Sequence, residues 1–324
     1  MRNVREVSTK TLALGTPETF SIPRNYAHRH LALRLAGSIT VAGGTTSGTP
    51  KTQGLWHLLS SLRIKRNGGD TVVSIPGWLL YELNKVFLGT APTLVNLASG
   101  DAQSNTAVNG TIIIPFENLR GIKPFDTLLK GSGLSSLDLL VDTAAASAMI
   151  NGGDRTVTAG TTAFTLNVTT VEETEVNNFV FGDIRTSLVH KVAITGASSN
   201  FQIKPLPTGN FYKAFMLFVE DAGAGSNSVI NKIKLKSGSE SFVDVNGLLL
   251  RDIYKQAYSL ESLSTGVYYV DLMPDGMLNS CLDVTPQTGR ETLELELDVA
   301  APSGTCYVYV VGLEYIPPVG VRKS

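Results

Sequence analysis

The sequence predicts an all-β protein made of two successive copies of one domain. Two observations carry this prediction: a series of strand-like segments occurs twice in the same order, and the chain is longer than one growing core supports. At 324 residues we expect two domains, at residues 1–175 and 176–324. Apolar residues make up 43% of the chain and charged residues 17%, which favours two buried cores over disorder.

The clearest part of the repeat is a block of two strands followed by a helix. It occupies residues 62–88 and 232–258, and it places Gly77 and Gly247 at equivalent positions 170 residues apart. After each glycine, apolar residues at helical spacing predict a helix with one apolar stripe. The stripe consists of Leu79, Leu80, Leu83 and Phe87 in the first copy, and of Leu249, Leu250, Ile253 and Ala257 in the second.

Strand-like segments recur in the same order on both sides of this block. The matched segments are 12–22 with 192–203, 31–35 with 215–219, 111–115 with 267–271, 137–142 with 293–298, and 164–168 with 307–311. Pro76 and Asn246 stand at equivalent positions, and both residue types suit the start of a helix. Several segments alternate apolar and polar residues with the period of two that is typical of strands.

Size and strand count narrow the type of sandwich. An immunoglobulin-type domain needs about 100 residues and seven strands, and each half of this chain is larger. An eight-stranded jelly roll fits both halves. We therefore predict two tandem eight-stranded jelly-roll β-sandwiches, each with a short flanking helix.

Residues 171–178 are polar and acidic, and we interpret them as the linker between the domains. Glu172, Glu173 and Glu175 could bind a hard cation such as calcium at a subunit contact, but a solvated linker is the favoured interpretation. Cys281 and Cys306 lie in the same half. We interpret them as free thiols of a protein made in the cytoplasm.

The charge of the chain gives no sign of a polyanionic partner. The net charge is −1, so we expect no specific recognition of nucleic acid. No uninterrupted apolar run approaches the ~18 residues of a membrane span. Basic residues gather at the two ends, in an N-terminal arm with Arg2, Arg5 and Lys10 and in a tail with Arg322 and Lys323. Either end could face lipid headgroups, although short terminal charges usually keep a chain end in water.

The sequence contains one partial pattern of possible metal ligands. His28 and His30 are spaced by two on a predicted strand, so they should share a face, as the first ligands of a cupin metal site do. That pattern then needs a carboxylate and a later histidine in a second motif. Arg34 stands near the carboxylate position, and after His57 no histidine follows until His190, in the other half. No G-x-S-x-G elbow, P-loop, H-E-x-x-H motif or EF-hand loop is present. We predict no catalytic, cofactor-binding or metal-binding residue, no cofactor, and no enzymatic activity.

Two other classes of protein remain as alternatives. A double-jelly-roll enzyme of the bicupin or glycan amidase type would need carboxylates or histidines clustered in one cleft. A carbohydrate-binding or adhesive module would usually expose aromatic residues in its loops. Trp56 and Trp78 instead fall beside or inside predicted regular elements, and Trp78 starts the repeated helix.

In its architecture the chain resembles the double-jelly-roll major capsid proteins of tailless icosahedral viruses, many of them bacteriophages with a membrane beneath the shell. The resemblance covers essentially the whole chain and rests on the two similar sandwiches, the repeated block and the long Gly/Ser/Thr loops. It implies a structural protein of the virion shell that forms homotrimeric, pseudo-hexagonal capsomers. The implied partners are neighbouring capsomers and minor or vertex proteins, and the N-terminal arm is a candidate contact to an internal membrane.

Two surface features would suit such a shell protein. Each half carries one basic and one acidic strand, whose charges could pair between subunits and fix their register, or could simply be solvated. The strands are marked by Arg63, Lys65 and Arg66 with Asp138 and Asp142, and by Lys232, Lys234 and Lys236 with Glu294, Glu296 and Asp298. The long loops at 38–54 and 89–110 are candidates for an outward-facing tower or for contacts between capsomers.

Overall fold

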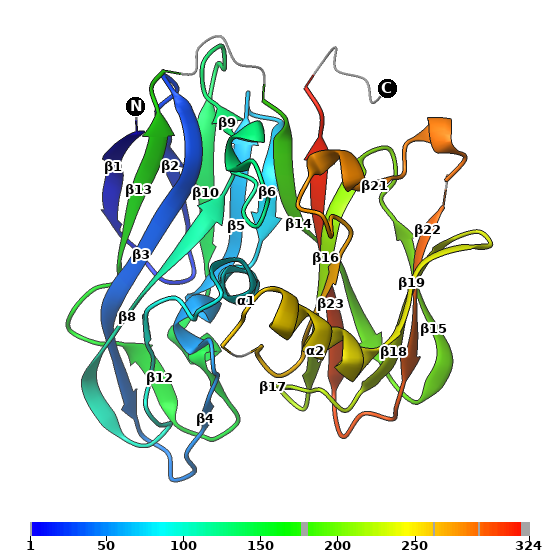
Figure 1. The fold of residues 1–324 in the computed structure, drawn as a ribbon. Coiled ribbons are helices and arrows are strands. Elements are labelled where there is room, and N and C mark those ends of the chain that lie inside the picture. Colours follow the sequence, from blue (N-terminus) through cyan, green and yellow to red (C-terminus); the bar gives the residue numbers. More distant parts are fainter. Residues whose placement is uncertain (1, 176–180, 262, 291, 319–324) are drawn as a thin grey trace. The chain divides into compact units, whose positions relative to one another are not determined.

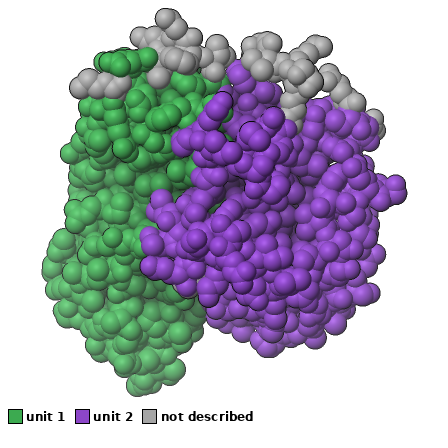
Figure 2. Space-filling view, viewed as in Figure 1, with its two compact units in different colours: residues 1–84, 91–119, 125–181 green, residues 85–90, 120–124, 182–324 purple. Residues whose placement is uncertain are grey.

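The chain divides into two compact units in a computed structural model that describes residues 2–175, 181–261, 263–290 and 292–318. Unit 1 comprises residues 1–84, 91–119 and 125–181, and unit 2 comprises residues 85–90, 120–124 and 182–324 (Figure 2). The boundary that we predicted after residue 175 adjoins residues 176–180, which lie outside the described residues.

Unit 1 contains the eight strands of a jelly roll in two sheets. The first sheet has the spatial order β1-β13-β3-β8, and the second has the order β6-β5-β10-β2 (Figure 1). Neighbouring strands in both sheets are antiparallel. The bounds are β1 (Arg2–Thr11), β2 (Pro17–Ser21), β3 (Ala27–Ala42), β5 (Leu59–Arg66), β6 (Asp70–Ile75), β8 (Gln103–Pro115), β10 (Leu137–Thr143) and β13 (Thr165–Glu173).

Shorter elements occupy the connections of unit 1. They are β4 (Thr49–Pro50), η1 (Gly54–Leu58), β7 (Leu94–Val95), η2 (Pro124–Asp126), β9 (Leu129–Lys130), η3 (Ala146–Met149), β11 (Ile150–Asn151) and β12 (Thr156–Ala159). The 3-10 helix η1 lies immediately before β5.

Unit 2 repeats this arrangement. Its sheets have the orders β14-β23-β16-β20 and β15-β22-β18-β19 (Figure 1). The bounds are β14 (Asp183–Ile194), β15 (Ser198–Leu206), β16 (Phe211–Asp221), β18 (Ile230–Ser237), β19 (Glu240–Asn246), β20 (Val267–Asp271), β22 (Leu293–Val299) and β23 (Cys306–Ile316). The connections hold β17 (Ala224–Gly225), η4 (Leu278–Ser280), β21 (Leu282–Asp283) and η5 (Pro286–Thr288).

Strand by strand, the two units correspond. The equivalent pairs in chain order are β1 with β14, β2 with β15, β3 with β16, β5 with β18, β6 with β19, β8 with β20, β10 with β22, and β13 with β23. Each segment matched in the sequence falls on or directly beside equivalent strands. The predicted pair of jelly rolls is therefore confirmed.

Alternation of side chains builds the cores between the sheets. On β22, Leu293, Leu295 and Leu297 are buried while the charged residues between them remain partly exposed. Leu31 and Leu33 on β3 are equally buried in unit 1. A strand with one apolar face buries that face against the opposite sheet, which is the main stabilisation available to a sandwich.

A helix stands between equivalent strands in each half of the chain, as the repeated block predicted. These helices are α1 (Gly77–Leu88) and α2 (Gly247–Ala257). The side chain of Asn246 accepts hydrogen bonds from the backbone N–H groups of Leu248 (3.0 Å) and Leu249 (3.2 Å). It therefore caps α2, as its residue type predicted.

Close packing at the helix start explains why both copies have a glycine there. A Cβ atom on Gly77 would lie 2.9 Å from the Cβ of Leu59, and one on Gly247 would lie 2.8 Å from the carbonyl oxygen of Ile230. Leu59 and Ile230 are the first residues of the equivalent strands β5 and β18. The repeated glycine thus preserves one contact, in which the helix start touches the start of the strand.

Each helix is also tied to the strand that follows it. Asn84 donates to the carbonyl of Ile113 on β8 (2.9 Å) and accepts from the N–H of the same residue (2.7 Å). At the equivalent position in α2, the hydroxyl of Tyr254 bonds the carbonyl (3.3 Å) and the N–H (2.9 Å) of Asp271 on β20. Two different side chains therefore make the same kind of anchor.

The predicted loops at 38–54 and 89–110 are partly wrong. β3 continues to Ala42 and β8 begins at Gln103, and the two strands pair through Ser38 with Ala107 and Val41 with Gln103. Threonine, serine and small residues made these stretches resemble loops. The connecting parts are residues 43–54 of the first predicted loop and residues 89–102 of the second, which contain only the two-residue strands β4 and β7 and the start of η1.

Candidate functional surfaces

A β-bulge separates the two histidines that the sequence placed on one face. His28 pairs with Glu172 and His30 with Val171, so Arg29 is an extra residue on β3 without a direct partner in β13. An extra residue breaks the alternation of side chains along a strand. The prediction that the two histidines share a face is therefore wrong.

The two histidines also have different partners. His28 is fully buried, and its ring nitrogens contact the hydroxyl of Thr170 (2.7 Å) and the carbonyl of Pro23 (2.8 Å). Burial lowers the pKa of His28, and a neutral ring satisfies both contacts by accepting from Thr170 and donating to Pro23. His30 instead contacts the carboxylate of Glu117 (3.2 Å). Among the described residues, no group of three His, Cys, Asp or Glu side chains could hold a metal ion.

The expected basic N-terminal arm is the first strand of the sandwich. Arg5 on β1 forms an ion pair with Glu172 (2.8 Å), and Lys10 donates to the carbonyl of Thr19 (2.6 Å). β1 pairs with β13 along its whole length. Two of the three expected free cations are thus used inside unit 1. The basic tail at 322–323 lies outside the described residues.

The predicted acidic linker is also partly a strand. Glu172 and Glu173 belong to β13, and Glu172 is fully buried against Arg5. An ionised carboxylate needs such a partner in the interior. The sequence could not reveal this partner because the two residues are 167 positions apart. The last part of the predicted linker, residues 176–178, lies outside the described residues.

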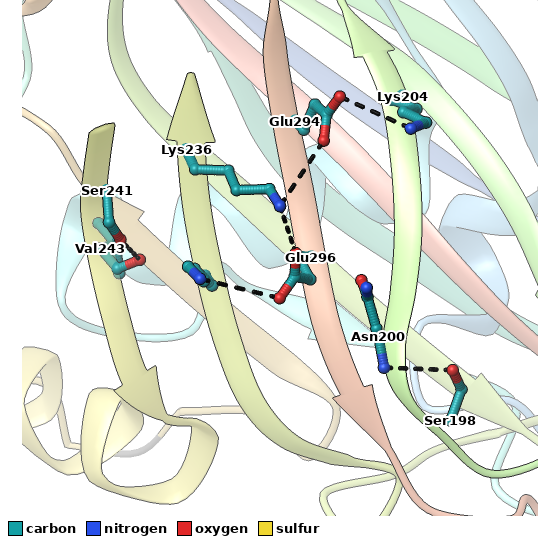
Figure 3. Close-up of polar contacts among 9 residues, drawn as sticks. Ser198, Asn200, Lys204, Lys236, Ser241, Val243, Glu294 and Glu296 are labelled. Atoms are coloured by element: carbon teal, nitrogen blue, oxygen red, sulfur yellow. Dashed lines mark hydrogen bonds and ion pairs between the residues drawn. The ribbon is translucent and has the colours of Figure 1, made fainter. Parts of the chain in front are cut away.

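Charged side chains form a ladder across three strands of unit 2. Lys236 on β18 lies 2.5 Å from Glu296 and 3.9 Å from Glu294 on β22, and Glu294 lies 3.6 Å from Lys204 on β15 (Figure 3). Lys234 reaches Glu296 at 3.9 Å. The predicted basic and acidic strands are therefore neighbours in one sheet, and they neutralise each other within the chain.

Unit 1 has a shorter version of the same arrangement. Arg63 on β5 lies 2.8 Å from Asp142 on β10, and Ser21 on β2 donates to Asp138 (2.9 Å). Pairing of these stripes between subunits, which we considered from the sequence, is not needed to balance their charge. Exposed pairs of this kind contribute little stability but help to fix the register of neighbouring strands.

The two tryptophans and the two cysteines of the chain are buried. Trp56 and Trp78 are buried, so neither provides the exposed platform of a carbohydrate-binding module. Cys281 and Cys306 are buried thiols and form no disulfide, as predicted. No described helix is long and apolar enough to cross a bilayer.

Exposed apolar side chains gather on α2. Leu248, Leu249 and Ile253 are 52%, 53% and 45% exposed, and they are three of the nine large apolar residues recorded as exposed in the described chain. Their equivalents in α1 are buried. The prediction of an apolar stripe is correct for both helices, but only α1 buries all of it.

Comparison with known proteins gives the fold an independent test. No family model and no curated protein sequence matches the chain. The solved structure of the STIV major capsid protein matches with a TM-score of 0.77 at 17% identity, covering 98% of this chain and 97% of that one. The major capsid protein of bacteriophage PM2 matches with a TM-score of 0.64 at 12% identity over 100% of both chains.

A third similar structure comes from the PBCV-1 virus capsid, with a TM-score of 0.63 at 10% identity over 97% of this chain and 93% of that one. These matches span both units. At such identities they establish the architecture that the strand order already indicates. The chain has the double jelly-roll fold of these major capsid proteins.

Proposed function

We propose that the protein is the major capsid protein of an icosahedral virus, a structural subunit of the virion shell without enzymatic activity. One observation carries the proposal: the match to capsid proteins extends over both units and nearly the full length of each compared chain. A fold alone does not specify a function. A whole-chain match to a two-domain arrangement is nevertheless more restrictive than a match to a single jelly roll.

The described surfaces support a role in assembly. The one partial metal pattern is divided between two unrelated hydrogen-bond networks. The charged stripes are neutralised within their own sheets, so the outer faces of these sheets would not strongly repel a second copy. Neither the enzyme nor the carbohydrate-binding alternative gains a specific supporting residue.

The proposed assembly is a homotrimer with a pseudo-hexagonal outline. Closed rings of identical subunits are a common way to satisfy interfaces that are not self-complementary. Three chains with two similar units each would supply six similar lobes, which suits hexagonal tiling. Neighbouring capsomers, minor or vertex proteins and an internal membrane remain predicted partners. A membrane contact through residues 2–11 is the least supported, because that segment is strand β1.

Light scattering of the purified chain after size-exclusion chromatography tests the proposal. A trimer would have a mass of about 104 kDa, three times the chain mass of 34.6 kDa. This species, or a larger closed particle, is the expected result. A chain that stays monomeric at all protein and salt concentrations would contradict the proposed function.

A further inference from the structure

The outward face of α2 lacks the cover that the same face has in α1. Offset by 170 residues, Leu248, Leu249 and Ile253 correspond to Trp78, Leu79 and Leu83. The α1 residues are buried and the α2 residues are about half exposed. Both helices share their start and their anchor to the next strand, so the difference comes from other parts of the chain that pack against α1.

One segment that packs against α1 is the segment that precedes β5. The ring of His57 on η1 stacks on Trp78 with 5.1 Å between centroids, and Trp56 stacks on Tyr81 at 6.4 Å. Just before η1, the side-chain amide of Gln53 donates to Glu82 of α1. Aromatic stacking and a buried hydrogen bond therefore hold the segment 53–58 against the side of α1 that carries Trp78, Tyr81 and Glu82, and of these Trp78 is the equivalent of Leu248.

The equivalent connection in unit 2 is shorter. The connection from β3 to β5 comprises the sixteen residues 43–58, whereas that from β16 to β18 comprises the eight residues 222–229. The described residues 222–229 contain the two-residue strand β17 and no helix. Leu248 therefore has no such segment over it, and it lies with Leu249 and Ile253 at the surface of the chain.

We propose that a second copy of this chain covers the α2 face, defined here as Leu248, Leu249 and Ile253. The inference rests on the proposed function and deepens it by naming one contact of the capsomer. Exposed apolar patches on soluble proteins commonly mark interaction sites. Three half-exposed side chains are far smaller than the ~800 Å² per partner of a stable interface. The α2 face is thus one part of a larger contact, as expected between subunits of a ring.

The charges beside the face favour a protein partner over a lipid surface. Asp252 and Lys255 are both exposed on α2 and have opposite signs. Arg251 donates to the carbonyl groups of Leu263 (3.1 Å) and Ser264 (3.0 Å), so its guanidinium is occupied. Helices that lie on membranes are rich in free lysine and arginine on the polar face. A rim of mixed sign instead suits a copy of a chain whose net charge is −1.

Thiol labelling measures the cover of the α2 face directly. Cys281 and Cys306 are buried, so they should react slowly with a maleimide. Leu249→Cys then introduces the one readily accessible thiol among the described residues. We expect a maleimide to react rapidly with this variant when the protein is dilute and monomeric. At concentrations where light scattering detects the oligomer, the reaction should slow by at least about tenfold. Val95→Cys, at an exposed position on β7 of unit 1, is the matched control and should not slow to this extent.

A pair of substitutions tests whether the α2 face contributes to assembly. Leu249→Ser with Ile253→Ser should raise the dissociation constant of the oligomer by about tenfold to a hundredfold, because each side chain would lose about 1 kcal/mol of interface burial. The melting temperature of the dilute monomer should change little, since both residues are already exposed in it. Val95→Ser is the control for the loss of an exposed apolar residue.

The outcomes separate this inference from the proposed function. A wild-type oligomer in which Leu249→Cys stays fully reactive, and which the paired serine variant forms equally well, would overturn the inference and leave the capsid proposal intact. Slow labelling that is already present in the dilute monomer would mean that the chain covers its own α2 face, which also overturns it. A wild-type chain that never assembles would contradict both.

Discussion

The helices α1 and α2 occupy the same position in two copies of one fold, yet they face different surroundings. Both begin at a glycine that touches the first residue of a strand, and both are anchored to the next strand by a side-chain hydrogen bond. The segment 53–58 packs on Trp78 of α1, where the apolar side chains are buried, whereas α2 exposes three aliphatic side chains. The difference distinguishes the contacts that both copies need to fold from the contacts of the outer helix face, which differ between the copies.

Contacts that define the jelly roll persist in both copies, while the outward faces have diverged. The glycine and the anchor fix the helix against the sandwich, so a change there would disturb the fold itself. The outer face depends on the length of a connection, and connections tolerate insertion and deletion. Buried residues of α1 should therefore govern stability, and exposed residues of α2 should govern association.

Truncation of equivalent apolar residues should give the largest contrast. Leu83→Ala removes a fully buried side chain and should lower the free energy of unfolding by about 2–5 kcal/mol. Ile253→Ala removes a half-exposed side chain and should change it by less than about 1 kcal/mol in the monomer. Urea denaturation followed by circular dichroism measures both. Equal losses would show that the α2 face is buried within the monomer.

Substitution of either repeated glycine should lower the free energy of unfolding by a similar amount, whereas substitutions in the two apolar faces should differ. Gly77→Ala and Gly247→Ala each force a methyl group to within 3 Å of a strand residue. We expect each substitution to cost about 1–3 kcal/mol in free energy of unfolding. Gly68→Ala is not a fair control because its φ is +74°; Gly69→Ala, where no atom lies within 4 Å, is suitable. A neutral effect at either helix start would contradict the proposed reason for the repeat.

The histidine that covers α1 should make the stability of unit 1 depend on pH. Burial lowers the pKa of His57 from 6.5 to about 3, so the unfolded chain binds a proton more readily than the folded chain. Stability contributed by neutral His57 is present above pH 6.5 and is lost as the pH falls towards 3. At pH 5.5 this loss should be about 1 kcal/mol.

The test is to compare the pH dependence of the urea midpoint in wild type and in His57→Gln. The variant should show a shallower decline between pH 6.5 and pH 4. His190→Gln is a matched control, because His190 lies in unit 2, where its ring contacts the carbonyl of Pro205. An unchanged slope in His57→Gln would mean that His57 is not held neutral beneath the surface.

Loss of a charge from the ladder in unit 2 should have the smallest effect. Lys236 lies 2.5 Å from Glu296, and its hydrogen bond lowers the pKa of that carboxyl. Lys236→Gln removes this charged partner. Because the pair is near the surface, we expect a small decrease in the urea midpoint that disappears in 1 M salt. Oligomer mass should not change. A large loss of assembly would restore the hypothesis that these charges act between subunits.

The sequence was sufficient to predict the duplication and the sandwich, because period-two alternation and the repeated glycine are local signals. The bulge at Arg29 was not predictable, since one extra residue leaves no mark on a short stretch of composition. Glu172 was misread as part of a solvated linker because its partner Arg5 is distant in the chain. These errors concern tertiary pairing, which alternation does not encode.

The exposure of the α2 face could not be predicted from the sequence for a similar reason. The stripes of α1 and α2 have the same apolar pattern, so they predict equal burial. One difference between their surroundings is the length of another connection, which in unit 1 brings His57 onto Trp78 beside the stripe. In retrospect, the difference between the sixteen residues before β5 and the eight before β18 was the available signal.

Electron microscopy of the purified oligomer tests the central claim most directly. If two similar jelly rolls per chain build a capsomer, class averages should show a closed particle with three-fold symmetry and six lobes of similar size. Single two-lobed particles, or a ring whose lobe number is not six, would contradict the account.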